Sequence, residues 1–344
     1  MLRPFDTVAQ LGNFSGADNG EFIICGIVGV ITKGKYGPTK QEEETFYDML
    51  MVDVLRGDDA TGAILVEKDG DFSIFKDQWQ PWWVIPEIRE HAHGKRMFSS
   101  GAAFIGHNRK ATVGKLTSET AHPFVVDKTF AMVHNGTLRN HKQLANTEVD
   151  SEALAKHLKP VLGADFNKEA FEEAIGKVEG AYAVACYNQE THKIHLFRNS
   201  ERPLCIIETK DAFFFGSEFG MVNWCAHRNN NLMKDSHSEY LDVHTLYTID
   251  LNTRVMTKEA FTPKKPTPTM VHTTSGGKSK VTQNTASDFK SKEDGTGLTK
   301  AEFKRIRRQF LGTSLKFYSD DYVEKNFPKT RKDGETEVLL MGVS

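Results

Sequence analysis

The feature that most constrains this chain is a cysteine placed inside an apolar, strand-like run. Residues 22–32 are rich in Ile and Val, and Cys25 is followed directly by Gly26 within this run. A short apolar run of this kind predicts a buried strand. Because a cysteine in such a strand is ordinarily a core residue, any chemistry at Cys25 depends on what the rest of the chain supplies.

Composition narrows the class of protein. The chain has 344 residues, of which 39% are hydrophobic, and a net charge of −2. That suits one large domain or two smaller ones and argues for neither a nucleic acid nor a membrane as partner. No apolar run approaches the roughly 20 residues of a membrane span, and the first residues do not form a secretion signal.

The cysteines indicate the compartment and exclude a common kind of metal site. The four cysteines are Cys25, Cys186, Cys205 and Cys225. Their spacing forms no CxxC pair and no zinc-binding pattern. Their small number favours a reducing, cytoplasmic setting. We therefore expect a cytoplasmic protein without a metal or a cofactor.

Hydrophobic periodicity predicts an α+β fold. A helix is expected over residues 41–55, where apolar side chains share one face, and Asp150 or Ser151 is expected to cap a helix that runs to about Leu158. A further helix is expected over 168–178. Strands are expected at 22–32, 62–67, 72–75, 103–107, 130–133, 180–187, 193–197, 204–208 and 212–216. Such groups of strands and helices predict two packed sheets covered by helices.

The end of the chain differs in composition from the rest. Residues 263–298 are rich in Lys, Thr, Ser, Gly and Pro, which predicts a flexible linker. Thr299 to Phe310 then reads as a basic amphipathic helix within a small α/β extension at 299–344. We therefore divide the chain into a leader at 1–24, a main domain at 25–262, the linker and the extension.

Three segments after Cys25 give the sequence a family likeness. They are Leu55–Gly62 with the pattern Arg-Gly-x-Asp-x-x-Gly, His107–Thr112, and His134-Asn135-Gly136 followed by Asn140-His141. In order and spacing, the chain from Cys25 to Arg228 resembles the glutaminase domain of class II glutamine amidotransferases, which are N-terminal nucleophile hydrolases. The resemblance implies a four-layer αββα sandwich and glutamine as the substrate.

The resemblance implies that Cys25 is the nucleophile and that its own α-amino group is the base. A free α-amine has a pKa near 8, which suits proton transfer at physiological pH. This mechanism requires Cys25 to be the first residue of the mature chain, so we expect cleavage between Ile24 and Cys25. The alternative is that the leader stays, and the protein then binds glutamine or another protein without turnover.

The resemblance also assigns the remaining site residues. Asn135 and Gly136 form the oxyanion hole, although an Asn-Gly pair is by default a hairpin turn. Arg109 binds the α-carboxylate of glutamine and Asp150 its α-amino group; alone, each is ordinarily a solvated arginine or a helix cap. Thr112 adds a hydrogen bond to the carboxylate, and Arg56 supports the loop beside the nucleophile.

Other matches look structural, and some positions depart from the family. His122, Arg198, the segment Arg202-Pro203-Leu204 and the segment Gly216-Ser217-Glu218 match family positions, and we assign them no chemical step. Lys110 stands where the family often has an aromatic residue, and Val113 where some members have histidine. These departures obscure which branch of the family the chain belongs to.

No synthase domain is recognisable beside the glutaminase-like region. We therefore expect a glutaminase subunit that passes ammonia to a separate acceptor enzyme, docked through the C-terminal region. The basic face of residues 304–308 leaves nucleic acid as a weaker alternative partner, since a solvated helix face is the commoner explanation.

Overall fold

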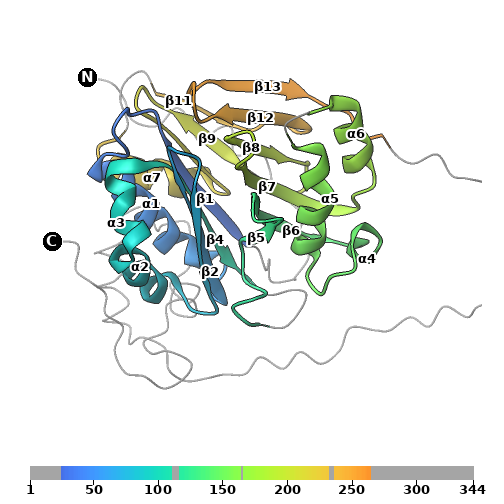
Figure 1. The fold of residues 1–344 in the computed structure, drawn as a ribbon, viewed down its shortest axis with the longest axis horizontal. Helices are drawn as coiled ribbons and strands as arrows, with labels where there is room; N and C mark the ends of the chain where they lie inside the picture. The colour runs from blue at the N-terminus through green and yellow to red at the C-terminus, as the bar shows by residue number, and fades with distance from the viewer. Residues whose placement is uncertain (1–24, 111–115, 164–165, 232–235, 265–344) are drawn as a thin grey trace, which may run out of the picture.

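A computed structural model of the chain describes residues 25–110, 116–163, 166–231 and 236–264 (Figure 1). The expected leader, Thr112, the basic extension and the linker after Lys264 lie outside the described residues. The described part comprises two sheets with helices on their outer faces. None of its helices combines the length and apolar character needed to cross a membrane.

The first sheet is antiparallel and has the strand that follows Cys25 at its middle. Its seven strands run in the order β11-β9-β10-β1-β4-β2-β3. Their bounds are β11 (His237–Tyr240), β9 (Cys205–Glu208), β10 (Ala212–Gly216), β1 (Gly26–Thr32), β4 (Gly101–Arg109), β2 (Ala60–Glu67) and β3 (Phe72–Asp77). Every residue of β1 is buried, as the apolar run predicts. Gly26 pairs with Asn108 of β4, which brings Cys25 to the end of that strand.

The second sheet is also antiparallel and has six strands in the order β13-β12-β8-β7-β6-β5. Their bounds are β13 (Met256–Ala260), β12 (Thr245–Asp250), β8 (Lys193–Arg198), β7 (Gly180–Asn188), β6 (Phe130–Leu138) and β5 (Phe124–Val126). The longest pairing joins β6 to β7 and runs without interruption from Phe130 to Leu138. This rigid pair carries the two residues expected to form the oxyanion hole.

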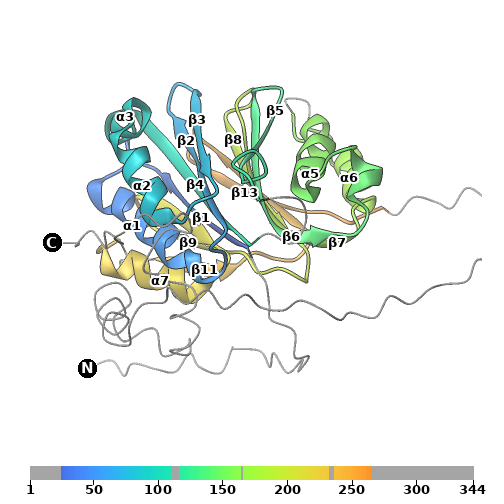
Figure 2. The same ribbon diagram turned by 90° about the horizontal axis from the view of Figure 1, so that it is seen from below.

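Helices cover the outer face of each sheet, so that the layers are helix, sheet, sheet and helix (Figure 2). On the first sheet lie α1 (Lys40–Val52), α2 (Pro81–Glu90), α3 (Ala92–Ser100) and α7 (Phe219–Arg228). On the second lie α4 (His141–Leu144), α5 (Asp150–Leu158) and α6 (Lys168–Gly176). Two 3₁₀ turns, Asp53–Leu55 and Lys159–Val161, extend α1 and α5. The predicted α+β architecture of two covered sheets is confirmed.

The alternation of side chains along each strand decides which residues face the interior between the sheets. In β1, Val28 packs with the helices of the first sheet, whereas Ile27 packs with the second sheet. In β6, Val133 likewise faces the first sheet. Because side chains alternate with a period of two, Cys25 and Asn135 both fall on the faces that the sheets turn toward each other.

Two local predictions are wrong. Asn135 and Gly136 do not end their strand in a turn; they lie inside β6, opposite Ala183 and Tyr182. The Asn-Gly turn signal is overridden because β7 continues to pair with β6 beyond this point. Neither Asp150 nor Ser151 caps α5, whose N-cap is Val149 without a side-chain cap, since the Asp150 carboxylate binds elsewhere.

Tyr187 ties the two sheets together and gives a test of the packing. Its hydroxyl is fully buried, donates to the Gly70 carbonyl at 2.7 Å and lies 2.8 Å from His192 Nδ1. We expect Tyr187→Phe to lower the free energy of unfolding by about 1–2 kcal/mol, because the two partners lose their hydrogen bond. Urea denaturation measures this. Tyr182→Phe on the same strand is the control, and an equal loss there would contradict this assignment.

Candidate functional site

Cys25 lies directly before β1, in a dry environment at the end of β4. Its Sγ lies 3.3 Å from the amide nitrogen of Lys110, which donates to it, and 3.4 Å from the Lys110 carbonyl oxygen. Burial raises the pKa of the thiol to about 11, although the Lys110 amide and the Arg109 charge both act to lower it. In the chain with residues 1–24 attached, Cys25 is therefore a protonated thiol near neutral pH.

Arg109 is the last residue of β4, and its positive charge lowers the pKa of the Cys25 thiol. Its guanidinium is buried and donates from Nη1 to the Thr120 hydroxyl at 3.0 Å. Cys25, Asp59 and Asp150 all act electrostatically on Arg109, and Arg109 and Asp150 both act on Cys25. The structure thus brings together the thiol, a cation and an anion that the sequence had placed far apart.

Asn135 presents its side chain from β6 toward the first sheet. The amide is fully buried, and its Nδ2 donates to the Ser217 hydroxyl at 3.2 Å. Its Oδ1 is also buried and has no hydrogen-bond partner among the described residues. A buried amide oxygen without a partner is uncommon and marks a polar position that an incoming molecule or water can complete.

Gly136 needs to be glycine because β7 approaches closely. A Cβ at this position would lie 1.9 Å from the Ala181 carbonyl oxygen and 2.5 Å from His134 Nε2. Only a residue without a side chain lets β7 and His134 pack this closely against the backbone beside Asn135. The pair therefore offers a side-chain amide and a backbone N–H from one rigid strand, which is the type of donor set that stabilises an oxyanion.

Asp150 joins the end of β6 to the start of α5. Its Oδ2 accepts from the Leu138 amide at 2.9 Å, and its Oδ1 accepts from the Ser151 amide at 2.9 Å. Ser151 Oγ in turn lies 2.9 Å from His134 Nδ1. The carboxylate is fixed by backbone donors and keeps acceptor positions that could receive an ammonium group.

Arg56 holds the backbone of Cys25 and is itself held by Glu218. Arg56 donates from Nε to the Cys25 carbonyl at 3.3 Å, and its Nη1 lies 2.8 Å from Glu218 Oε2. The loop that Arg56 opens is also fixed, since the Asp59 amide donates to the Arg109 carbonyl at 3.0 Å. This geometry agrees with a supporting role for Arg56 rather than contact with the thiol.

A buried carboxyl behind Gly26 was not predicted from the sequence. Asp53 is 1% exposed, and a Cβ on Gly26 would lie 1.9 Å from its Oδ2. Burial raises the pKa of Asp53 to about 8, despite the opposing charge of Arg56 and a 3.4 Å hydrogen bond from Asn108. It begins the short 3₁₀ turn Asp53–Leu55 after α1, and no sequence pattern there separates it from a surface aspartate.

Lys110 departs from the family pattern and has a local partner. Its ammonium lies 2.8 Å from Asp58 Oδ1 and 3.7 Å from Asp59 Oδ2. The ion pair connects the end of β4 to the loop that begins at Arg56. Asp58 therefore balances the charge of Lys110, the residue whose backbone contacts Cys25.

His122 lies next to this site but has no contact with the thiol in the described structure. Its ring stacks on His107 at 3.8 Å between centroids, and burial lowers its pKa well below the usual value. His107 has a pKa lowered by burial to about 3. Both rings are neutral packing groups near neutral pH, which agrees with the structural role expected for His122.

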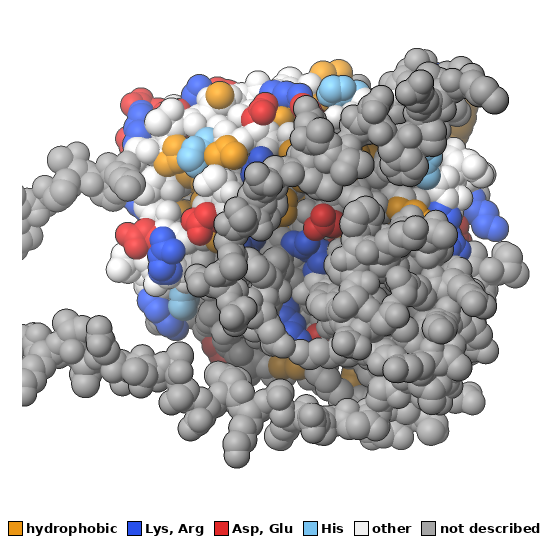
Figure 3. Space-filling view, turned by 180° about the vertical axis from the view of Figure 1, so that it is seen from behind, with side chains coloured by type: hydrophobic (Ala, Val, Ile, Leu, Met, Phe, Trp, Pro, Cys, Tyr) orange, Lys and Arg blue, Asp and Glu red, His pale blue; other side chains and the backbone are white. Residues whose placement is uncertain are grey.

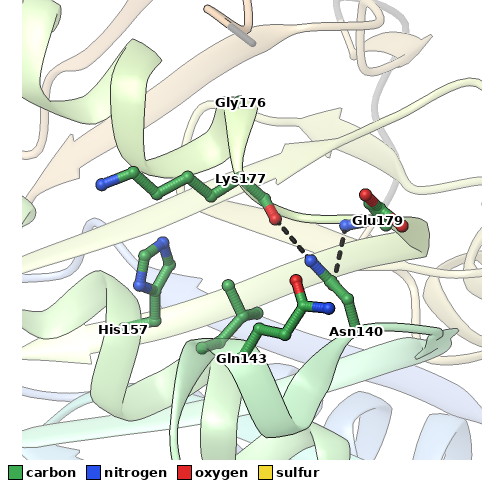
Figure 4. Close-up of a pocket in the computed structure, with 7 residues that line it drawn as sticks. Asn140, Gln143, His157, Gly176, Lys177 and Glu179 are labelled. Atoms are coloured by element: carbon green, nitrogen blue, oxygen red, sulfur yellow. Dashed lines mark hydrogen bonds between the residues drawn. The ribbon is translucent and has the colours of Figure 1, made fainter. Parts of the chain in front are cut away.

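A pocket in the described structure lies away from Cys25. It has a volume of about 370 Å³ and is lined by residues of α4, α5 and the end of α6, including Asn140, His157 and Lys177 (Figure 4). The Asn140 side chain donates from Nδ2 to the Lys177 carbonyl, and its Oδ1 accepts from the Glu179 N–H. None of the expected site residues lines this cavity, so we do not take it for the glutamine site.

Neither the surface charge on the face in Figure 3 nor the placement of metal-binding side chains in the described residues indicates a second functional site. Where the face in Figure 3 is not grey, acidic and basic side chains are intermingled. Among the described residues, no group of three or more His, Cys, Asp or Glu side chains could hold a metal ion. The arrangement around Cys25 is therefore the one with convergent chemistry: a thiol, a guanidinium, a fixed carboxylate and an amide.

The acidity of Cys25 gives a direct test of this environment. In the full-length chain we expect iodoacetamide to label Cys25 slowly at neutral pH, and its rate to rise about tenfold per pH unit toward pH 11, because the thiolate is the reactive form. Mass spectrometry of the Cys25 peptide measures the rate. A plateau near pH 8.5, as for an ordinary thiol, would contradict the burial described here.

Comparison with known families supports a specific identity for this region. Residues 107–223 match the model of a family described as "Glutamine amidotransferase domain". That range includes Arg109, Asn135, Gly136 and Asp150, and it does not reach Cys25 or Arg56. The matched range therefore covers the residues expected to bind glutamine and form the oxyanion hole, apart from Arg56, but not Cys25.

Curated relatives are larger proteins. The chain is 27% identical over 210 residues to the glutamine–fructose-6-phosphate aminotransferase (isomerizing) of Helicobacter pylori, covering 58% of this chain and 33% of that one. It is 31% identical over 222 residues to the amidophosphoribosyltransferase of Pasteurella multocida, covering 57% and 42%. The chain thus spans about a third to two fifths of the length of these relatives.

A solved structure has the same fold. The glutamine phosphoribosylpyrophosphate amidotransferase from B. subtilis superposes with a TM-score of 0.53 at 20% identity, covering 70% of this chain and 50% of that one. At this identity the likeness concerns the fold alone. It supports the arrangement of two packed sheets.

Proposed function

This chain carries a class II glutamine amidotransferase domain of N-terminal nucleophile hydrolase fold, and from that premise we propose that it hydrolyses the side-chain amide of glutamine through Cys25. The products are glutamate and ammonia. The observation that carries the proposal is the convergence of three groups. Cys25 lies before the start of β1, where its Sγ accepts from the Lys110 amide at 3.3 Å, Arg109 ends β4, and Asp150 begins α5 and acts electrostatically on both.

In the proposed reaction, the Cys25 thiolate attacks the side-chain carbonyl carbon of glutamine. Asn135 Nδ2 and the Gly136 N–H receive the negative charge that develops on the oxygen. Ammonia leaves with the proton taken from the thiol, and a thioester to Cys25 remains. Water then cleaves the thioester to give glutamate and restore the thiol.

Recognition of the amino-acid end of glutamine is assigned to two fixed charges. The Arg109 guanidinium can pair with the α-carboxylate through two parallel hydrogen bonds, and the Asp150 carboxylate can receive the α-ammonium group. Thr112 is proposed to add a hydrogen bond to the carboxylate. Because Arg109 and Asp150 are held by Thr120 and by backbone amides, little side-chain freedom would be lost on binding.

The base for the reaction is proposed to be the α-amine of Cys25 itself. With Ile24 attached, the nitrogen of Cys25 is an amide and cannot take a proton. The high pKa of the buried thiol, about 11, makes an adjacent base necessary near neutral pH. We therefore propose that residues 1–24 are removed before the enzyme is active.

Substitution of the nucleophile separates catalysis from binding. We expect Cys25→Ala to abolish ammonia release from glutamine in a chain that begins at residue 25, because no other thiol faces Arg109. A coupled ammonia assay measures this. Cys186→Ala is the control, since Cys186 is buried in β7 and its sulfur contacts the His195 carbonyl.

The alternative function is a non-catalytic protein on the same fold that keeps residues 1–24 and binds glutamine or a protein. In that case Cys25→Ala would change neither ammonia release, which would already be at background, nor glutamine binding. Calorimetric titration with glutamine on the same samples distinguishes a binder from an inactive preparation.

We further propose that the ammonia passes to a separate acceptor enzyme in the cytoplasm, docked through the C-terminal region. Phe261, Thr262 and Lys264 belong to the folded domain, since Lys264 donates its N–H to the Glu172 carbonyl at 2.9 Å. A truncation should therefore end after Lys264 rather than before it.

Removal of residues 265–344 tests this docking. We expect the shortened protein to keep its glutaminase rate and its unfolding midpoint but to lose the acceptor enzyme in co-purification from its natural host. Treatment of the full-length complex with nuclease is the control for a bridging nucleic acid. Undiminished capture of the acceptor by the shortened protein would contradict docking through this region.

A further inference from the structure

We propose that Ser217 is a positioning residue for this reaction: its hydroxyl fixes the carboxamide of Asn135 across the gap between the two sheets. This inference rests on the proposed function. Ser217 follows β10 directly, and from the sequence we assign it no chemical step. In the described structure its hydroxyl bonds Ile27 and Asn135 and has no hydrogen bond to Cys25, so we expect its effect on catalysis to pass through these residues.

The hydroxyl of Ser217 joins three parts of the site. It accepts from the Ile27 N–H at 3.0 Å and from Asn135 Nδ2 at 3.2 Å, and the Ser217 N–H donates to the Ile27 carbonyl at 2.9 Å. Ile27 is two residues after the nucleophile on β1, whereas Asn135 belongs to β6 of the other sheet. Ser217 therefore sets the distance between the strand of the nucleophile and the oxyanion amide.

The hold on Asn135 is exclusive within the described structure. Ser217 Oγ is the only hydrogen-bond partner of the Asn135 side chain there, and Oδ1 has none. Both side chains are fully buried or nearly so, at 0% and 1% exposure. Without the Ser217 hydroxyl, the Asn135 amide has no hydrogen-bond partner among the described residues that holds its orientation. The amide can then turn about its last side-chain torsion, which is broad for a carboxamide.

The orientation of this amide matters for the chemistry. One end is a donor and the other an acceptor. The donor end stabilises the negative charge of the transition state, while the oxygen end repels it. An amide that samples both orientations would therefore bind substrate nearly as before but lose stabilisation of the transition state. The expected signature is a fall in kcat with little change in KM.

The residue after Ser217 also supports the site, through a contact with Arg56. Glu218, the next residue, lies 2.8 Å from Arg56, which donates to the Cys25 carbonyl. Two adjacent residues after β10 thus reach the backbone of the nucleophile and the oxyanion amide. This arrangement explains why a strand end far from Cys25 in sequence can tune the reaction.

The test compares Ser217→Ala, Asn135→Ala and the double variant in a chain that begins at residue 25. We expect Asn135→Ala to lower kcat by roughly 100- to 1000-fold, as for removal of an oxyanion donor. We expect Ser217→Ala to lower kcat by about tenfold or more, with KM for glutamine within about twofold. In the double variant, loss of Ser217 should add nothing, because it acts through Asn135.

Thr209→Val is the matched control. Thr209 is a buried hydroxyl at the other end of the same β9–β10 hairpin, where its Oγ1 bonds the Asp211 and Ala212 backbone. We expect it to lower the unfolding midpoint without lowering kcat. If Ser217→Ala does not fold, Ser217→Cys keeps the volume with a weak hydrogen-bonding group and should show the same fall in kcat.

Two results would overturn the inference itself, and a third would overturn the proposed function. A Ser217→Ala enzyme with wild-type kcat would show that the hydroxyl does not position the amide. A further fall in kcat on adding Ser217→Ala to Asn135→Ala would show that Ser217 acts independently. If the wild-type chain beginning at residue 25 releases no ammonia, the proposed function fails first, and the inference loses the reaction on which it depends.

Discussion

The hydrogen bonding of β1 between β10 and β4 is the constraint on which the site depends. It places the thiol at the end of β4, beside Arg109 and Lys110. Side-chain alternation then turns Cys25 toward the second sheet, where β6 carries Asn135. A shift of β1 by one residue would exchange its two faces. Gly26 rather than Cys25 would then face the second sheet, and the thiol would be separated from Asn135.

Burial from solvent determines the acidity of the groups in this site. Burial raises the pKa of Cys25 to about 11 and that of Asp53 to about 8, while Arg109 opposes the first shift and Arg56 the second. A dry site strengthens fixed charges and dipoles, which favours an oxyanion amide, but it also suppresses the thiolate. The two requirements are reconciled if a base is generated next to the thiol, as removal of residues 1–24 would do.

Much of this could be predicted from the sequence, and the failures have physical causes. The strand at Cys25 and most of the other strands were predictable because their apolar runs are long and buried. Asn135 and Gly136 were read as ending their strand, since local turn chemistry cannot reveal that β7 pairs beyond them. Asp53 and the link from Ser217 to Asn135 depend on contacts between residues distant in the sequence, which no local pattern encodes.

The central claim is that Cys25 becomes the first residue of a working enzyme. The most direct measurement is the intact mass of the protein purified from its natural host, with the ammonia-release rate of the same sample. We expect a mass lower by residues 1–24 in an active sample. Full ammonia release by a chain that still begins at Met1 would contradict the account, because the nitrogen of Cys25 would then be an amide and could not act as the base.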